Sequence, residues 1–357
     1  MKIIHCADLH LDSKMETNLS LIKAHERKIE ILHTFERMVD YAAEHAVNAI
    51  IIAGDMFDTS RVMNSTKNRV LNTIKKYPQI DFLYLSGNHD ESNFIAMLDE
   101  VPANLKIFGE SWTSYDYTGV TISGVVLSSS NRKTIYDTLR LSNDHLNIVV
   151  MHGQIGQYDA KDQAEVINLN QLKHKHIDYL ALGHIHSYTQ GKLDQRGTYC
   201  YAGCLEGRGF DECGAKGFVL LDTAGGVIKS KFIPFAARQM IELPFDITPY
   251  ADWFAIEDQI LARTKVFPDR DLIRVVLQGK YKMSMEKHLG MLEQKLDRFY
   301  CVKVKDDSVL DVTEADVAHD ISLRGEFVRQ VLQSDLSAEA KEQTILVGLR
   351  ALSGEDL

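Results

Sequence analysis

Five short apolar segments, each running directly into polar residues, constrain the fold of this 357-residue chain more than any other feature. They are Lys2–Ala7 before Asp8 and His10, Ala49–Ala53 before Asp55 and Asp58, Phe82–Ser86 before Asn88 and His89, Ile148–Met151 before His152, and Tyr179–Leu182 before His184 and His186. Short runs rich in Ile, Val, Leu and Tyr are typical of buried strands. Because ligands gather at the carboxyl ends of strands in open α/β sheets, the sequence predicts one polar site at a single sheet edge.

Amphipathic stretches lie between these segments, at Arg27–His45 and Val62–Tyr77, with apolar residues at helical spacing. A hairpin is expected later, formed by Gly217–Leu221 and Val227–Pro234. This alternation of strands and helices predicts a layered α/β fold. The chain is longer than one core usually holds, so we also expect a second, smaller domain.

The pattern changes after Pro234, where an α+β unit begins. Its expected elements are strands near Gln239–Leu243, Leu272–Gln278 and Cys301–Val304 and helices near Trp253–Thr264 and Met285–Phe299. Two tail helices follow, the second capped by Ser337. Their apolar faces consist of Ile321, Phe327, Val328, Val331 and Leu332, and of Ile345, Leu346, Leu349 and Leu352. We therefore predict domains at residues 1–234, 235–305 and 306–357.

The net charge of −10 is concentrated in the tail, since residues 306–357 contain 12 acidic and 4 basic side chains. It argues only weakly against a polyanionic substrate. No apolar run approaches the roughly 18 residues that span a bilayer. The five cysteines have no paired spacing, and a zinc site from Cys200, Cys204 and Cys213 would lack the usual pattern. These features favour a cytoplasmic protein with reduced thiols.

The residue types at the strand ends suit two divalent ions. Carboxylate and amide oxygens bind hard ions such as Mn²⁺, and imidazoles bind Mn, Fe or Zn. Asp-x-His at residues 8–10 and His-x-His at 184–186 point both side chains to one face if the backbone is extended. Glycines precede three of the candidate ligands and let the backbone turn tightly. A lone Asp-x-His or Gly-Asp arises by chance or for structural reasons, so the prediction depends on all five strand ends together.

The order Asp-x-His, Gly-Asp-x-x-Asp, Gly-Asn-His-Asp, His-Gly and Gly-His-x-His resembles the calcineurin-like metallophosphoesterase superfamily over about residues 1–234. The resemblance implies an α/β fold (α+β by some schemes), a four-layered β-sandwich flanked by helices, and two divalent metal ions. It implies a first ion on Asp8, His10, Asp55 and His186 and a second on Asp55, Asn88, His152 and His184. It also implies that His89 is the catalytic histidine and that Asp58 orients it.

The physical interpretation agrees with these roles. Two ions about 4 Å apart would polarise a phosphate ester and lower the pKa of a bound water. We expect His89 to stabilise the transition state or to protonate the leaving oxygen, with Asp58 fixing its tautomer. A His89→Gln variant that kept full turnover with unchanged metal binding would contradict this role.

Three features resemble the SbcD-like DNA repair exonucleases. They are Asp8–Ser13, Tyr201–Arg208 followed by Glu212 and Lys216–Phe218, and the α+β unit at Phe235–Lys305, where that family carries a capping domain over DNA. Ser322–Arg329 in the tail resembles the YhaO-like branch. The resemblance implies a Mn²⁺-dependent 3′→5′ exonuclease and single-strand endonuclease in DNA repair, associated with the nucleoid, with Fe, Zn or Mg as alternative metals.

The same resemblance implies partners. They are DNA, an SMC-like (SbcC-like) ATPase docked on the C-terminal helices, and a second copy joined through the helices after Asp58 and Asp90. The tail helices could equally well pack on the capping domain alone. Candidate DNA contacts are loop residues near the predicted edge, namely Arg61, Arg132, Lys133, Tyr188, Arg196 and Arg208. Surface basic residues are common, so each of these assignments has a plain solvent-exposed alternative.

Two other functions remain open from the sequence. A small-molecule phosphodiesterase or nucleotidase would need only a compact cap over one nucleotide. A non-catalytic DNA-end scaffold would keep the metals for structure but would have no use for His89.

Overall fold

The computed structural model describes residues 1–15, 19–58, 62–87, 98, 100–156, 166–282, 285–312 and 317–352. The chain divides into two compact units, Met1–Met240 and Ile241–Leu357. No helix in the described ranges is both long enough and apolar enough to cross a lipid bilayer.

Two six-stranded sheets form the first unit. The first sheet has the order β14-β13-β1-β2-β3-β4, with β1 at Lys2–Cys6, β2 at Ala49–Ala53, β3 at Asp81–Leu85, β4 at Leu105–Ile107, β13 at Gly217–Asp222 and β14 at Lys229–Pro234. The second has the order β11-β12-β10-β7-β6-β5, with β5 at Thr113–Tyr117, β6 at Val120–Gly124, β7 at Leu146–His152, β10 at Tyr179–Gly183, β11 at Thr189–Lys192 and β12 at Thr198–Tyr201. The strands β1 to β4 run parallel, as do β6, β7, β10 and β12, so each sheet gathers several carboxyl ends at one edge.

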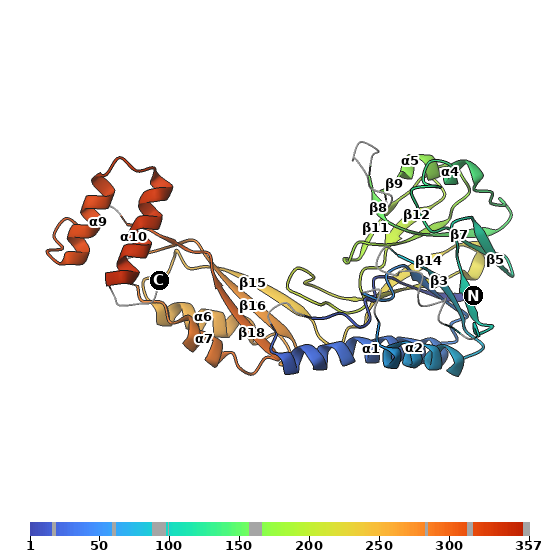
Figure 1. Ribbon diagram of the computed structural model, residues 1–357, viewed down its shortest axis with the longest axis horizontal. Coiled ribbons are helices and arrows are strands. Elements are labelled where there is room, and N and C mark those ends of the chain that lie inside the picture. Colours follow the sequence, from blue (N-terminus) through green and yellow to red (C-terminus); the bar gives the residue numbers. More distant parts are fainter. Residues whose placement is uncertain are drawn as a thin grey trace. The chain divides into compact units, whose positions relative to one another are not determined.

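Helices cover the outer face of each sheet, which gives the four predicted layers. The helices α1 (Leu21–Glu44) and α2 (Asn64–Lys76) lie side by side in Figure 1 and pack on the first sheet. The short helices α4 (Ile135–Thr138) and α5 (Leu169–Leu172) pack on the second sheet. Two-stranded pairing of β8 (Gln154–Ile155) with β9 (Val166–Ile167) completes the unit.

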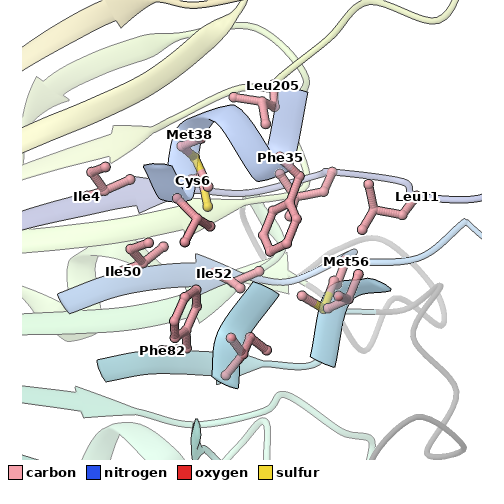
Figure 2. Close-up of a cluster of buried hydrophobic side chains, with 14 of the residues drawn as sticks. Ile4, Cys6, Leu11, Phe35, Met38, Ile50, Ile52, Met56, Phe82 and Leu205 are labelled. Carbon is pink, nitrogen blue, oxygen red and sulfur yellow. The ribbon is translucent and has the colours of Figure 1, made fainter. Parts of the chain in front are cut away.

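Strand periodicity explains why the sheets are apolar on both faces. In β2, Ile50 and Ile52 point into the core beneath α1, where Phe35 and Met38 meet them (Figure 2). The alternate residue Ile51 points into the core between the two sheets. Because successive side chains face opposite ways, a strand buried on both sides must be apolar throughout.

The first helix begins earlier than its periodicity predicts, at Leu21 rather than Arg27. Its first turn leaves Leu21 and Ile22 exposed, so those residues add nothing to the apolar stripe. The start is set instead by Ser20, whose Oγ accepts a hydrogen bond from the amide of Lys23 at 3.4 Å.

The second unit contains a three-stranded sheet in the order β15-β16-β18. Its elements are β15 (Met240–Asp246), which starts at the end of the first unit, α6 (Trp253–Thr264), β16 (Leu272–Gln278), β17 (Lys280–Tyr281), α7 (Leu289–Lys295), β18 (Cys301–Asp306), β19 (Val309–Leu310), α9 (Leu323–Gln333) and α10 (Ala338–Leu352). Figure 1 shows α6 and α7 together beside the sheet. One hydrophobic core joins the sheet of this unit to its helices. It includes Ile256 of α6, Val275 of β16, Val328 of α9 and Ile345 of α10.

Two predictions for this unit are wrong in detail. The helix expected at Met285–Phe299 is limited to Leu289–Lys295, since residues 285–288 have no regular structure and a turn follows at residues 296–298. Ile321 does not share a helix face, since α9 begins at Leu323 after the N-cap Ser322 and Ile321 is fully exposed.

Candidate metal centre

The predicted ligands that the structure describes lie at the carboxyl ends of four strands. They are Asp8 and His10 after β1, Asp55 after β2, His152 at the end of β7, and His184 and His186 after β10. The site is therefore shared by the edges of two sheets rather than one, because β1 and β2 belong to one layer and β7 and β10 to the other. Asn88, His89 and Arg61 lie outside the described residues.

Backbone hydrogen bonds lock the loops after β1 and β2 together. The amide of Asp8 donates to the carbonyl of Gly54 at 3.1 Å, and that of His10 donates to the carbonyl of Asp55 at 3.0 Å. The second sheet joins them because the amide of His184 donates to Oδ1 of Asp8 at 2.8 Å. Asp8 is thus fixed between the two sheets.

Four of these residues have a positive φ, which is 50° at Asp8, 43° at His10, 50° at Asp55 and 101° at His184. Each such conformation costs on the order of 1–3 kcal/mol, and strain of this kind is concentrated at functional sites. The extended backbone predicted for the Asp-x-His motif is therefore wrong. The left-handed backbone at these residues points their side chains in directions that a regular strand would not allow.

Glycines allow the two sheets to approach each other closely at the site. A Cβ on Gly183 would lie 1.9 Å from the carbonyl oxygen of Ala53 in the opposite sheet. A Cβ on Gly54, which has a φ of +92°, would lie 2.0 Å from Nδ1 of His152. The glycines before the ligands are needed for close approach as well as for turning.

Asp8, His10 and His186 form a group that we call the first pocket, with ligand atoms within 4.8 Å of one another. The Nε2 atoms of His10 and His186 lie 3.1 Å apart. Oδ2 of Asp8 is buried and has no hydrogen-bond partner among the residues that the structure describes. Burial also raises the pKa of Asp8, so its ionised form requires nearby positive charge. This donor set fits a divalent cation.

Asp8, Asp55 and His152 form a second group, the second pocket, within the same distance limit. Nε2 of His152 lies 3.4 Å from Oδ2 of Asp55. Nδ1 of His152 lies 2.9 Å from the carbonyl of Ala53, and since a carbonyl only accepts, that nitrogen carries the proton. Burial lowers the pKa of His152, but the hydrogen bond and charge of Asp55 outweigh it and raise the pKa to about 9. The ring of His184 lies beside this pocket, 5.4 Å from that of His152.

Two carboxylates and an arginine surround the histidines of the first pocket. Oδ1 of Asp58 lies 3.0 Å from Nδ1 of His10, and Oε1 of Glu212 lies 2.6 Å from Nδ1 of His186. Arg208 pairs with both carboxylates, at 2.7 Å and 2.8 Å. Burial alone would raise the pKa of Asp58 and of Glu212, but these hydrogen bonds and charges hold both below their ordinary values.

Residues 1–188 match the family model described as calcineurin-like phosphoesterase. The chain belongs to the calcineurin-like phosphoesterase family. The DNA double-strand break repair protein Mre11 of Sulfolobus acidocaldarius is 21% identical over 336 residues, which are 88% of this chain and 84% of that protein. Mre11 of Sulfurisphaera tokodaii is 24% identical over 341 residues, covering 90% and 84%. The uncharacterized metallophosphoesterase YhaO of Bacillus subtilis is 27% identical over 316 residues, covering 83% and 76%.

Calcineurin-like phosphoesterases use two divalent metal ions, and the two pockets of this member fit that requirement. Each pocket combines carboxylate oxygen with imidazole nitrogen, and Asp8 offers an atom to both. The protein is accordingly a metallophosphoesterase that hydrolyses phosphoester bonds.

The candidate DNA contacts lie in different settings. Arg132 and Lys133 are in the loop before α4, and Tyr188 is exposed and stacks on Phe232 with ring centroids 4.5 Å apart. Arg196 pairs with Asp178, the residue that precedes β10. It therefore lies at the amino end of that strand, so the expectation that it borders the site is wrong.

Proposed function

We propose that this protein is a two-metal-dependent nuclease that hydrolyses DNA phosphodiester bonds in DNA repair. The observation that carries the choice of DNA is the extent of the likeness to the two Mre11 proteins. It covers 88% and 90% of this chain, well beyond the part that the phosphoesterase model matches. A phosphoesterase with an unrelated substrate would be expected to resemble them in the catalytic unit alone.

The proposed ion ligands follow from the two pockets and the family pattern. The first ion would be held by Asp8, His10, Asp55 and His186, and the second by Asp55, Asn88, His152 and His184. Two bound Mn²⁺ ions would supply Lewis acidity at the phosphate and a lowered pKa for water. His89 would donate a proton to the leaving oxygen. Asp58, which contacts His10, would serve the first pocket whether or not it also orients His89.

The phosphate backbone of DNA would contact loop residues near the site. We propose Arg61, Arg132, Lys133 and Tyr188 for this role, because basic and hydroxyl side chains supply most contacts to phosphates. Arg208 is assigned differently, since its guanidinium already pairs with Asp58 and Glu212.

We propose an SMC-like ATPase as partner, docked on the outer face of the tail helices. The inner face is occupied, because Val328, Ile345 and Leu349 are buried in the core of the second unit. Leu346 and Val347 on α10 are exposed and apolar. Deleting the tail would uncover that core, so point substitutions on the exposed face are the sharper test.

The double variant Leu346→Asp/Val347→Asp should lose co-purification with a co-expressed SMC-like ATPase while keeping Mn²⁺-dependent hydrolysis of a model phosphodiester. Val227→Asp, at an exposed apolar position in the hairpin turn of the first unit, is the matched control. Undiminished co-purification of the double variant would show that the tail helices serve packing alone.

A homodimer through α2 and the segment after Asp90 remains part of the proposal, and the mass of the purified protein in solution tests it.

The nuclease proposal is tested by incubating end-labelled duplex and single-stranded DNA with the protein and Mn²⁺, with Asp55→Asn as the inactive control. Shortening from the 3′ end and internal cleavage of single strands are the expected products. Hydrolysis of cyclic nucleotides or nucleoside monophosphates without DNA cleavage would identify a small-molecule phosphoesterase instead. Binding of metal and DNA without any hydrolysis would identify a scaffold.

A further inference from the structure

The loop between β12 and β13 carries an ionic network that the metal ligands alone do not explain. Arg208 and Glu212 lie in this loop, while Asp58 lies 150 residues earlier, after β2. Arg208 Nη1 donates to Asp58, and both its Nη2 and Nε donate to Glu212, at 2.8 Å and 3.2 Å. The backbone amide of Arg208 also donates to Glu212 at 2.7 Å. The arginine therefore bridges two carboxylates from separate parts of the chain.

Each carboxylate also contacts the outer ring nitrogen of one histidine in the first pocket. Asp58 meets Nδ1 of His10 at 3.0 Å, and Glu212 meets Nδ1 of His186 at 2.6 Å. Glu212 accepts at this distance only if Nδ1 of His186 carries the proton, which leaves Nε2 of that ring with its lone pair, whereas Asp58 approaches Nδ1 of His10 as an ion-pair partner. Arg208 Nη2 also lies 3.2 Å from Nδ1 of His186, but the shorter Glu212 contact takes that proton.

We propose that Asp58, Arg208 and Glu212 form a clamp that positions His10 and His186 with their Nε2 atoms facing each other, and that this clamp sets the metal affinity of the first pocket. The two Nε2 atoms, only 3.1 Å apart, would repel each other as lone pairs without an external restraint or a cation between them. A carboxylate on the outer nitrogen fixes the tautomer and the ring orientation and makes the inner nitrogen a stronger ligand.

The loop that carries the clamp is anchored to the rest of the first unit. Glu206, which is buried, accepts from Arg27 Nη2 at 3.1 Å and from Thr34 Oγ1 at 2.7 Å, and both donors belong to α1. At the other end, Lys216 Nζ donates to the carbonyl of His186 at 2.7 Å. These contacts tie both ends of the clamp loop to the rest of the first unit.

The second pocket is built in another way. Its histidine, His152, is held at Nδ1 by the backbone carbonyl of Ala53. A side-chain substitution in the clamp should therefore weaken one ion and leave the other. The inference rests on the two-metal site of the proposed function but not on DNA as the substrate.

The test is a titration of the metal-free full-length protein with Mn²⁺ alone, followed by calorimetry and by electron paramagnetic resonance. The wild-type protein should bind two ions and give a spin-coupled pair. Glu212→Gln keeps the shape of the side chain but removes its charge. It should bind one ion normally and the other roughly 10–100-fold more weakly, with an uncoupled Mn²⁺ signal.

Glu36→Gln is the matched control, because Glu36 forms a two-pronged pair with Arg69 between α1 and α2. It should bind both ions as the wild type does. If Glu212→Gln fails to fold by circular dichroism, Arg208→Gln, which removes the bridge between the two carboxylates, is measured in its place with the same expected split.

Two unchanged affinities in a folded clamp variant would overturn the proposal. Equal weakening of both ions would also overturn it, because the clamp would then act through general stability. A wild-type protein that binds fewer than two ions would contradict the two-metal site itself, a failure that is separate from either of these outcomes.

Discussion

The two metal pockets share Asp8 but are held by different kinds of contact. In the first pocket, side chains from distant loops hold the outer nitrogens of His10 and His186. In the second, a backbone carbonyl holds His152, and glycines leave just enough room for its ring. The first pocket should therefore respond to changes of charge around it, and the second to changes of volume. The predictions below remove the ligand that both ions share, weaken the loop that supports the first pocket, or separate these two responses.

The largest effect is expected for Asp55→Asn, which changes the one carboxylate that both proposed ligand sets contain. Oδ2 of Asp55 lies 3.8 Å from Nε2 of His10 and 3.4 Å from Nε2 of His152, and the amide loses the charge that faces both ions. We expect both Mn²⁺ affinities to fall by roughly 100-fold or more, beyond the range for residues that only support a ligand. Calorimetric titration measures this. Loss of a single ion would mean that Asp55 does not bridge the two ions.

The next effect concerns the anchor of the clamp loop. Arg27→Met would leave the buried Glu206 without its charged partner, which costs about 3–5 kcal/mol of stability. Urea unfolding of the metal-free protein measures the change. Arg69→Met is the control, because the Arg69–Glu36 pair is more exposed and should cost only about 0–1 kcal/mol. Equal losses for both variants would remove the special role of the buried pair.

A change of volume should affect the second pocket. In Gly183→Ala the new Cβ would meet the carbonyl of Ala53 at 1.9 Å and Nδ1 of His152 at 2.8 Å. We expect a stability loss of about 1–3 kcal/mol and a selective weakening of one Mn²⁺ ion. Gly109→Ala, where a Cβ meets nothing within 4 Å, should change neither quantity. If both ions bind Gly183→Ala normally, close packing does not set the second pocket.

The smallest effect is expected for Arg208→Lys. It keeps the positive charge of the clamp but loses the forked guanidinium that pairs with both carboxylates at once. A lysine reaches one carboxylate at a time, so the first pocket should weaken by about 10-fold, the low end for a supporting residue. Arg132→Lys, in the loop before α4, is the corresponding control for metal binding. A loss in Arg208→Lys as large as in Glu212→Gln would mean that the fork, rather than the charge, governs the clamp.

Strong hydrophobic patterning made the central strands predictable. The segments expected at β1, β2 and β10 are confirmed to within about two residues, because each is buried on both faces and so apolar throughout. The edge strands β5 and β11 were not predicted. Their sequences, Thr113–Tyr117 and Thr189–Lys192, are polar and partly exposed, so they lack the apolar pattern of a buried strand although each pairs with the next strand along the chain.

The same contrast holds for the site. Ligands placed directly after buried strands could be predicted, because the apolar pattern of each strand shows where the strand ends and the ligand positions begin. Arg208 and Glu212 lie in an irregular loop, and nothing local to them indicates that they would meet Asp58 and His186. The left-handed backbone at Asp8 and His10 could not be predicted from the sequence either, since it arises from the hydrogen bonds between two loops.

The most direct test of the account is to titrate metal-free protein with Mn²⁺ while following cleavage of end-labelled single-stranded DNA. We expect cleavage to rise as the second ion binds and to be absent in Asp55→Asn at every concentration. Full cleavage with one ion bound, or two ions bound without any cleavage of DNA, would contradict a two-metal nuclease.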